Sequence, residues 1–121
     1  MAKSKILVVD DSATEMIMIT TPLRAEGYEV ITAKDGEEAL RRLNDDQPDL
    51  VVLDVIMPGK NGFQLCRQIR NDTRYSALPV ILLTSKSQEA DKFWGMKQGA
   101  TAFMTKPFAT DALLATIRQH V

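Results

Sequence analysis

The sequence has one cysteine and one histidine, and their scarcity excludes several classes of site. A single thiol, Cys66, cannot form an internal disulfide. A lone thiol suits a reducing compartment, so we expect a cytoplasmic protein. The one histidine, His120, is the penultimate residue. We therefore expect neither a zinc site nor a catalytic triad built on histidine.

The sequence also lacks a charge excess and long apolar runs. Its formal net charge is −1, which gives no support to nucleic-acid binding, so we expect no such partner. The apolar runs are far too short to cross a bilayer and no signal sequence opens the chain, so we expect no membrane association. At 121 residues, of which 45% are hydrophobic and 26% charged, the chain has the size and composition of one globular domain.

Strand patterns alternate with helix patterns along the whole chain. Residues 6–9, 50–53 and 79–83 are apolar runs typical of strands buried on both faces, and weaker strand patterns cover 28–33 and 101–105. Helical spacing of apolar residues follows each strand. Right-handed connections between five such βα units predict a doubly wound (βα)5 α/β domain with a parallel sheet in the order 2-1-3-4-5.

Several local features of the helices carry further expectations. Ser12 followed by Glu15 predicts a capping box at the start of the first helix. Pro22 lies inside that helix and is expected to kink its last turns, because proline has no N–H to donate. Thr110 or Asp111 is expected to cap the last helix. Cys66 lies on an apolar stripe and is expected to be a core residue.

Polar residues follow most of the predicted strands where each one ends. They are Asp10, Asp11, Asp54, Thr84 and Lys106. Each alone would be an ordinary turn, capping or surface residue. Because the carboxyl ends of parallel strands share one edge of a sheet, we expect all five to lie together. Three neighbouring carboxylates repel one another unless a cation lies among them, and a ligand set made only of oxygen favours Mg²⁺.

This combination fits the transfer of a phosphoryl group. Metal, lysine and hydroxyl would meet the charge on the phosphoryl oxygens, and Asp54 could take the group as an aspartyl phosphate. A rival hypothesis is a Mg²⁺-dependent phosphatase with an aspartate nucleophile. Those enzymes usually carry an acid–base aspartate two residues after the nucleophile, where this chain has Ile56. We therefore expect a phosphoacceptor and not an enzyme.

Four motifs together are specific to one family. They are Val8-Val9-Asp10-Asp11-Ser12, Leu53-Asp54-Val55-Ile56-Met57-Pro58 with Gly62, Thr84-Ser85 and Lys106-Pro107-Phe108. Through them, over essentially its whole length, the chain resembles the receiver domains of two-component response regulators. The resemblance implies a flavodoxin-like three-layer sandwich and phosphorylation by a histidine kinase.

The resemblance also implies roles for the site residues. Asp54 would be the phosphoacceptor. Asp11, Asp54 and the backbone carbonyl of Ile56 would bind Mg²⁺, with Asp10 holding the metal through water. Thr84 and Lys106 would contact the phosphoryl oxygens.

A further implied role is that of a switch. Phe103 matches the family's switch aromatic and would move inward when Thr84 moves toward the phosphoryl group. The Lys106–Pro107 peptide bond is expected to be cis. Two departures from the family are the phenylalanine itself, which lacks the tyrosine hydroxyl of flagellar chemotaxis receivers, and Ala109, where many relatives have a capping aspartate.

A narrower resemblance concerns residues 12–16 and 92–100. These segments are similar to stand-alone receivers of type IV pilus systems, which serve twitching motility or pilus-driven phototaxis and are fed by a chemotaxis-type histidine kinase. Residues 1–121 are accordingly expected to form one receiver domain without an output domain. We expect a monomer, with dimerisation on activation as the alternative.

Signalling would then depend on which protein the domain binds. We expect phosphorylation to change the face built by the fourth helix, fifth strand and fifth helix, where Trp94 is either a partner contact or a half-buried packing residue. Two alternatives stay open: a phosphate sink that drains a shared kinase, and a module that binds partners without phosphorylation.

Overall fold

The computed structural model describes residues 4–57, 59, 61–85 and 89–121. Within these ranges five parallel strands form one sheet in the order β2-β1-β3-β4-β5, which confirms the predicted topology. The strands are β1 (Lys5–Val9), β2 (Glu29–Ala33), β3 (Leu50–Asp54), β4 (Val80–Thr84) and β5 (Ala102–Thr105). Pro58 and Lys60, expected in the turn after β3, lie outside the described residues.

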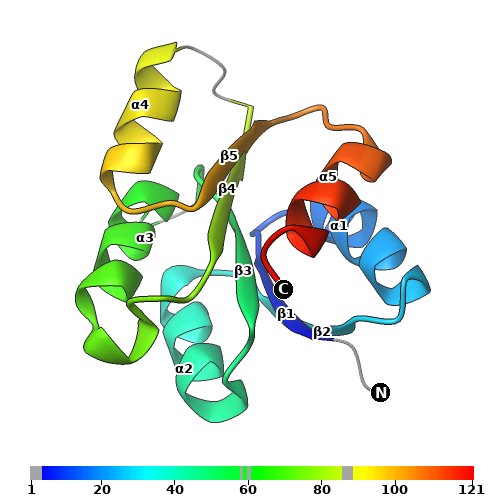
Figure 1. Cartoon of the computed structure of the whole chain (residues 1–121), viewed down its shortest axis with the longest axis horizontal. Coiled ribbons are helices and arrows are strands. Elements are labelled where there is room, and N and C mark those ends of the chain that lie inside the picture. Colours follow the sequence, from blue (N-terminus) through cyan, green and yellow to red (C-terminus); the bar gives the residue numbers. More distant parts are fainter. Residues whose placement is uncertain (1–3, 58, 60, 86–88) are drawn as a thin grey trace.

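Helices cover both faces of the sheet and make the predicted three layers. They are α1 (Ala13–Ala25), α2 (Gly36–Asp46), α3 (Gly62–Asn71), α4 (Glu89–Lys97) and α5 (Thr110–Arg118), with a 3-10 turn, η1 (Thr73–Tyr75), after α3. Helices α1 and α5 lie on one face, and α2, α3 and α4 lie on the other (Figure 1). No helix in the described part of the chain is long and apolar enough to cross a membrane.

Side chains of the sheet alternate between two hydrophobic cores. Leu7 and Val9 of β1 pack toward α2 and α3, whereas Ile6 and Val8 pack toward α1 and α5. This alternation follows from the two-residue period of a strand, and it explains why strands covered on both faces are continuously apolar. Cys66 is buried in the first core, as expected.

The order of the strands determines how deeply each is buried. Strand β3 pairs with β1 and β4, and all five of its residues are buried. Strand β2 pairs only with β1 and is largely half-buried, which agrees with its weaker pattern in the sequence. The strand that ends on Asp54 is therefore buried along its whole length.

The start of α1 corrects one expectation. The Ser12 side chain accepts the backbone N–H of Glu15 at 3.2 Å, as predicted for the cap. The second half of a capping box is absent between these two residues, because the N–H of Ser12 donates to Asp10 Oδ1 at 2.9 Å. A complete capping box is found instead at α3, between Asn61 and Gln64.

Two other helix features were expected. Helix α1 continues through Pro22 to Ala25, and its kink stays a prediction. The prediction of a Thr110 or Asp111 cap is wrong: α5 has Ala109 at the capping position, and the alanine side chain makes no capping hydrogen bond. The Lys106–Pro107 peptide bond is cis, as the resemblance implied.

Gly62 lets α3 begin directly against the end of β3. Its N–H donates to the Val55 carbonyl at 2.8 Å. A Cβ atom at this position would overlap the Asp54 carbonyl oxygen and would lie 2.7 Å from the Val55 Cα. These are backbone atoms, which have little room to yield, so only glycine allows this close approach. The contact fixes the strand end that carries Asp54.

Candidate functional site

The carboxyl ends of β1 and β3 bring two buried carboxylates together. Val9 is in register with Leu53, so Asp10 and Asp54 follow paired positions on neighbouring strands. Asp10 is 2% exposed and Asp54 is 6% exposed. Burial of a carboxylate is costly without a positive partner, so these two side chains need one nearby.

Lys106 provides that positive charge. It follows β5 and reaches across the ends of the strands. Its ammonium nitrogen lies 3.2 Å from Asp10 Oδ2, 3.4 Å from Asp54 Oδ1 and 2.7 Å from Glu15 Oε2. The structure thus gathers Asp10, Asp54 and Lys106 at one edge, where the sequence predicted them.

Glu15 is a member of this cluster that sequence reasoning missed. Carboxylate oxygens of Asp10, Glu15 and Asp54 all lie within 4.8 Å of one another, and they form the group suited to holding a metal ion in the described part of the chain. Its spacing after Ser12 predicts a role in a capping box instead. The available signal was its position in the first turn of α1, the helix that begins right after the acidic strand end.

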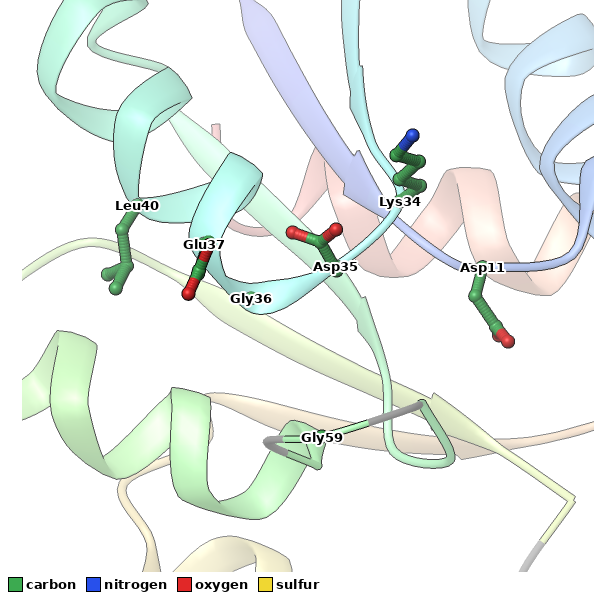
Figure 2. Close-up of a pocket in the computed structure, with 7 residues that line it drawn as sticks. All are labelled: Asp11, Lys34, Asp35, Gly36, Glu37, Leu40 and Gly59. Atoms are coloured by element: carbon green, nitrogen blue, oxygen red, sulfur yellow. The ribbon is translucent and has the colours of Figure 1, made fainter.

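Asp11 is placed differently from its neighbour Asp10. Its side chain is exposed and lines an adjacent hollow of about 600 Å³ beside the first turn of α2 (Figure 2). The other lining residues are Lys34, Asp35, Gly36, Glu37, Leu40 and Gly59. Asp11 is not part of the group within 4.8 Å, and its role as a metal ligand stays a prediction.

The remaining predicted site residues lie on β4, on β5, on α4 and directly after β3. Thr84 is fully buried at the end of β4, where its carbonyl accepts the N–H of Lys106 at 2.7 Å. The side chain of Ile56 is exposed, and its backbone N–H donates to the Asp54 carboxylate. Phe103 is half-buried on the core beneath α4, and Trp94 is exposed on α4.

Burial dominates the proton affinity of Asp54. Loss of solvent raises the pKa of Asp54 from 3.8 to about 6, and the nearby charge of Asp10 adds to the increase. The ammonium of Lys106 and the N–H of Ile56 act in the opposite direction and hold the pKa of Asp54 below pH 7. Asp54 is therefore largely ionised at neutral pH, but its carboxylate form is less stable here than in water.

The same contacts shift the other three groups. Burial raises the pKa of Asp10. The hydrogen bond from Lys106 lowers the pKa of Glu15. Burial acts to lower the pKa of Lys106, but the hydrogen bond to Glu15 and the charges of Asp54 and Asp10 raise it overall. The ammonium therefore stays charged at neutral pH and neutralises part of the acidic cluster.

The donor set fits a hard divalent cation. It contains only oxygen, two of its carboxylates are buried, and Asp11 lies at the adjacent hollow. One ammonium faces three carboxylates, so the cluster keeps a net negative charge that a cation would neutralise. Oxygen ligands with no thiolate or imidazole favour Mg²⁺ over the softer transition metals.

Comparison with known proteins identifies the family. Residues 6–118 match the family described as response regulator receiver domain, and the chain belongs to that family. It is therefore a phosphoacceptor signalling module of two-component systems and not a classical enzyme, and receivers of this family take their phosphoryl group from histidine kinases.

The relatives include one of similar length and one about twice as long. The chain is 46% identical over 114 residues to Protein PilH of Pseudomonas aeruginosa, and the match covers 94% of each chain. It is 42% identical to the alkaline phosphatase synthesis transcriptional regulatory protein PhoP of Bacillus subtilis, of which it covers 47%. The chemotaxis protein CheY4 of Vibrio cholerae has the same fold, with a TM-score of 0.93, 36% identity and coverage of 99% of this chain and 100% of that one.

Replacement of Asp54 by asparagine should stabilise the metal-free protein. A pKa raised from 3.8 to about 6 means that ionised Asp54 destabilises the folded state by about 2–3 kcal/mol. The folded pKa lies above the unfolded one, so this cost is fully present above about pH 6 and disappears as the pH falls below about 4.

We expect chemical denaturation without Mg²⁺ to show this gain for Asp54→Asn at pH 7 and none at pH 3.5. Asp45→Asn, which removes an exposed carboxylate from the end of α2, should change the free energy of unfolding little at either pH. An Asp54→Asn variant that is less stable than the parent at pH 7 would contradict the proposed electrostatic cost.

Proposed function

We propose that this chain accepts a phosphoryl group on Asp54 from a histidine kinase and then changes the proteins it binds. The observation that carries the proposal is the position of Asp54, which is buried beside Asp10 and lies 3.4 Å from the Lys106 ammonium, with 6% of its surface exposed. A group that is ionised at neutral pH and poorly solvated is suited to act as a nucleophile.

In the transfer step, a carboxylate oxygen of Asp54 attacks the phosphorus of the donor phosphohistidine. A P–O bond forms and the P–N bond breaks, and its electron pair stays on the imidazole nitrogen, which is then protonated by water. Lys106 would meet one of the phosphoryl oxygens and the Thr84 hydroxyl another. Attack of water on the phosphorus later returns Asp54 as a carboxylate and releases inorganic phosphate.

Asp10, Asp11, Asp54 and the carbonyl of Ile56 would hold Mg²⁺. When bound, the metal supplies positive charge to the phosphoryl oxygens and holds them in place. The chain's own part is to keep these oxygen ligands together at the ends of β1 and β3 and to keep Lys106 charged beside them.

The structure supports a route from this site to α4. The N–H of Lys106 bonds to the Thr84 carbonyl, which ties the end of β5 to the end of β4. Phe103 lies on β5 against Gly95 of α4, where a Cβ atom would be 3.0 Å from the Phe103 ring and 2.9 Å from Leu82. Helix α4 thus rests directly on Phe103. Movement of Thr84 toward the phosphoryl group would let Phe103 turn inward and shift α4.

The face formed by α4, β5 and α5 has the character of a protein-binding surface. Three large apolar side chains of α4 are exposed: Phe93 by 64%, Trp94 by 53% and Met96 by 43%. A hollow of about 400 Å³ reaches from Glu89 and Lys92 of α4 to Ala112 of α5 and is lined partly by Phe103. Several large apolar side chains exposed on one helix are suited to contact another protein.

The sequence similarity to PilH supports a role in signalling for pilus-driven motility, with a chemotaxis-type histidine kinase as the phosphodonor. The likeness to CheY4 supports the same broader class of signalling. We place the protein in the cytoplasm, as a monomer, where such a kinase would present its phosphohistidine.

Phosphorylation is tested by intact mass after incubation with acetyl phosphate. We expect one phosphoryl adduct in the presence of Mg²⁺ and none when the metal is chelated. Asp54→Asn should give no adduct, because the attacking oxygen is replaced by an amide. An adduct on the Asp54→Asn protein would show that another residue is the nucleophile, and its absence from the parent protein would contradict the proposed function.

The switch is tested with the fluorescence of Trp94, the single tryptophan of the chain. Mg²⁺ with fluoroberyllate, which mimics a phosphoryl group, should change the emission because α4 moves when Phe103 turns. Phe103→Leu should retain fluoroberyllate binding by calorimetry and lose most of the emission change. If Phe103→Leu responds as fully as the parent, the route through Phe103 is wrong.

A further inference from the structure

Glu15 makes the shortest of the three contacts of the Lys106 ammonium. The distance is 2.7 Å to Glu15, against 3.2 Å to Asp10 and 3.4 Å to Asp54. The three carboxylates also differ in their access to solvent: the Glu15 side chain is 41% exposed, the Asp54 side chain 7%, and the Asp10 side chain not at all. Glu15 is thus the closest partner of Lys106 and the one at the rim.

The cap of α1 does not require this carboxylate. Ser12 accepts the backbone N–H of Glu15, and the N–H of Ser12 is satisfied by Asp10. The helix therefore starts correctly whichever way the Glu15 side chain points. Its carboxylate is directed at Lys106, so the contact belongs to the acidic site and not to the helix end.

All three N–H donors of the Lys106 ammonium already have an acceptor, so none is left for a phosphoryl group. An ammonium has three N–H donors, and each one here points at a different carboxylate. A phosphoryl oxygen on Asp54 can accept from Lys106 only if one carboxylate gives up its hydrogen. Asp10 is buried and Asp54 carries the phosphoryl group, so Glu15, at the solvent rim, is the partner that can leave.

We propose that Glu15 is a positioning residue that competes with the phosphoryl group for Lys106. This inference rests on the proposed function. In the unphosphorylated protein, Glu15 holds the ammonium at the outer side of the site. On phosphorylation Lys106 exchanges Glu15 for a phosphoryl oxygen, and the free carboxylate turns to water. Glu15 thus favours the unphosphorylated state and limits how readily Asp54 is loaded.

The test compares Glu15→Gln with the parent at saturating Mg²⁺. Fluoroberyllate affinity is measured by calorimetry, and the rate of phosphorylation by acetyl phosphate is measured by intact mass. We expect both to rise about fivefold, which corresponds to the ~1 kcal/mol that a unit charge a few ångströms away contributes in solvated surroundings. Glu29→Gln, the same change of charge at the exposed start of β2, should match the parent.

A second variant separates contact from charge. Glu15→Asp keeps the negative charge but is one methylene shorter, so its oxygen should no longer reach Lys106. We expect Glu15→Asp to bind fluoroberyllate more tightly than the parent, in the same direction as Glu15→Gln. If Glu15→Asp equals the parent while Glu15→Gln binds more tightly, general repulsion of anions explains the effect and the exchange at Lys106 is wrong.

Two other outcomes would also overturn the inference. Weaker fluoroberyllate binding by Glu15→Gln at saturating Mg²⁺ would place Glu15 among the residues that hold the metal. Equal binding by Glu15→Gln and the parent would make the Glu15–Lys106 contact irrelevant to loading. If instead the proposed function is wrong, the parent protein itself would bind no fluoroberyllate and accept no phosphoryl group, which distinguishes the two failures.

Discussion

The structure depends on one ammonium placed among three carboxylates. Parallel pairing of β1 with β3 brings Asp10 and Asp54 side by side at an edge where both are buried. Lys106 offsets part of their repulsion, whereas burial, with a smaller contribution from the charge of Asp10, raises the pKa of Asp54. A site with excess negative charge is suited to take up a cation, which would relieve the imbalance and then meet the charge of a transferred phosphoryl group.

The same strand ends that hold the charges also connect the site to the surface. Lys106 follows β5 directly, and its N–H bonds to the carbonyl of Thr84. Phe103, on the same strand, supports α4 at Gly95. Under the proposed function, a change in the partners of Lys106 and Thr84 would act on β5, and through Phe103 on the helix that carries Trp94. Such a connection between the site and an exposed helix would suit a switch.

The fold was predictable from the sequence because its signals are periodic and redundant. Apolar runs, the alternation of strands and helices and the handedness of the connections all favoured one topology. The meeting of Asp10, Asp54 and Lys106 followed from that topology alone. Cis geometry at Lys106–Pro107 came only from family resemblance, since no periodic pattern specifies it.

What the sequence did not reveal depends on the direction of individual side chains. Ser12 and Glu15 fit a capping box by spacing, and only coordinates show that Asp10 satisfies Ser12 and leaves Glu15 to bind Lys106. Asp11 is adjacent to Asp10 in sequence but lines a different hollow. The cap of α5 was misplaced because Ala109 offers no side-chain signal.

The measurement that tests the central claim most directly is a ¹³C NMR titration of the Asp54 carboxyl without Mg²⁺. We predict a midpoint near pH 6, and a midpoint near 4, as in a solvated aspartate, would contradict the account.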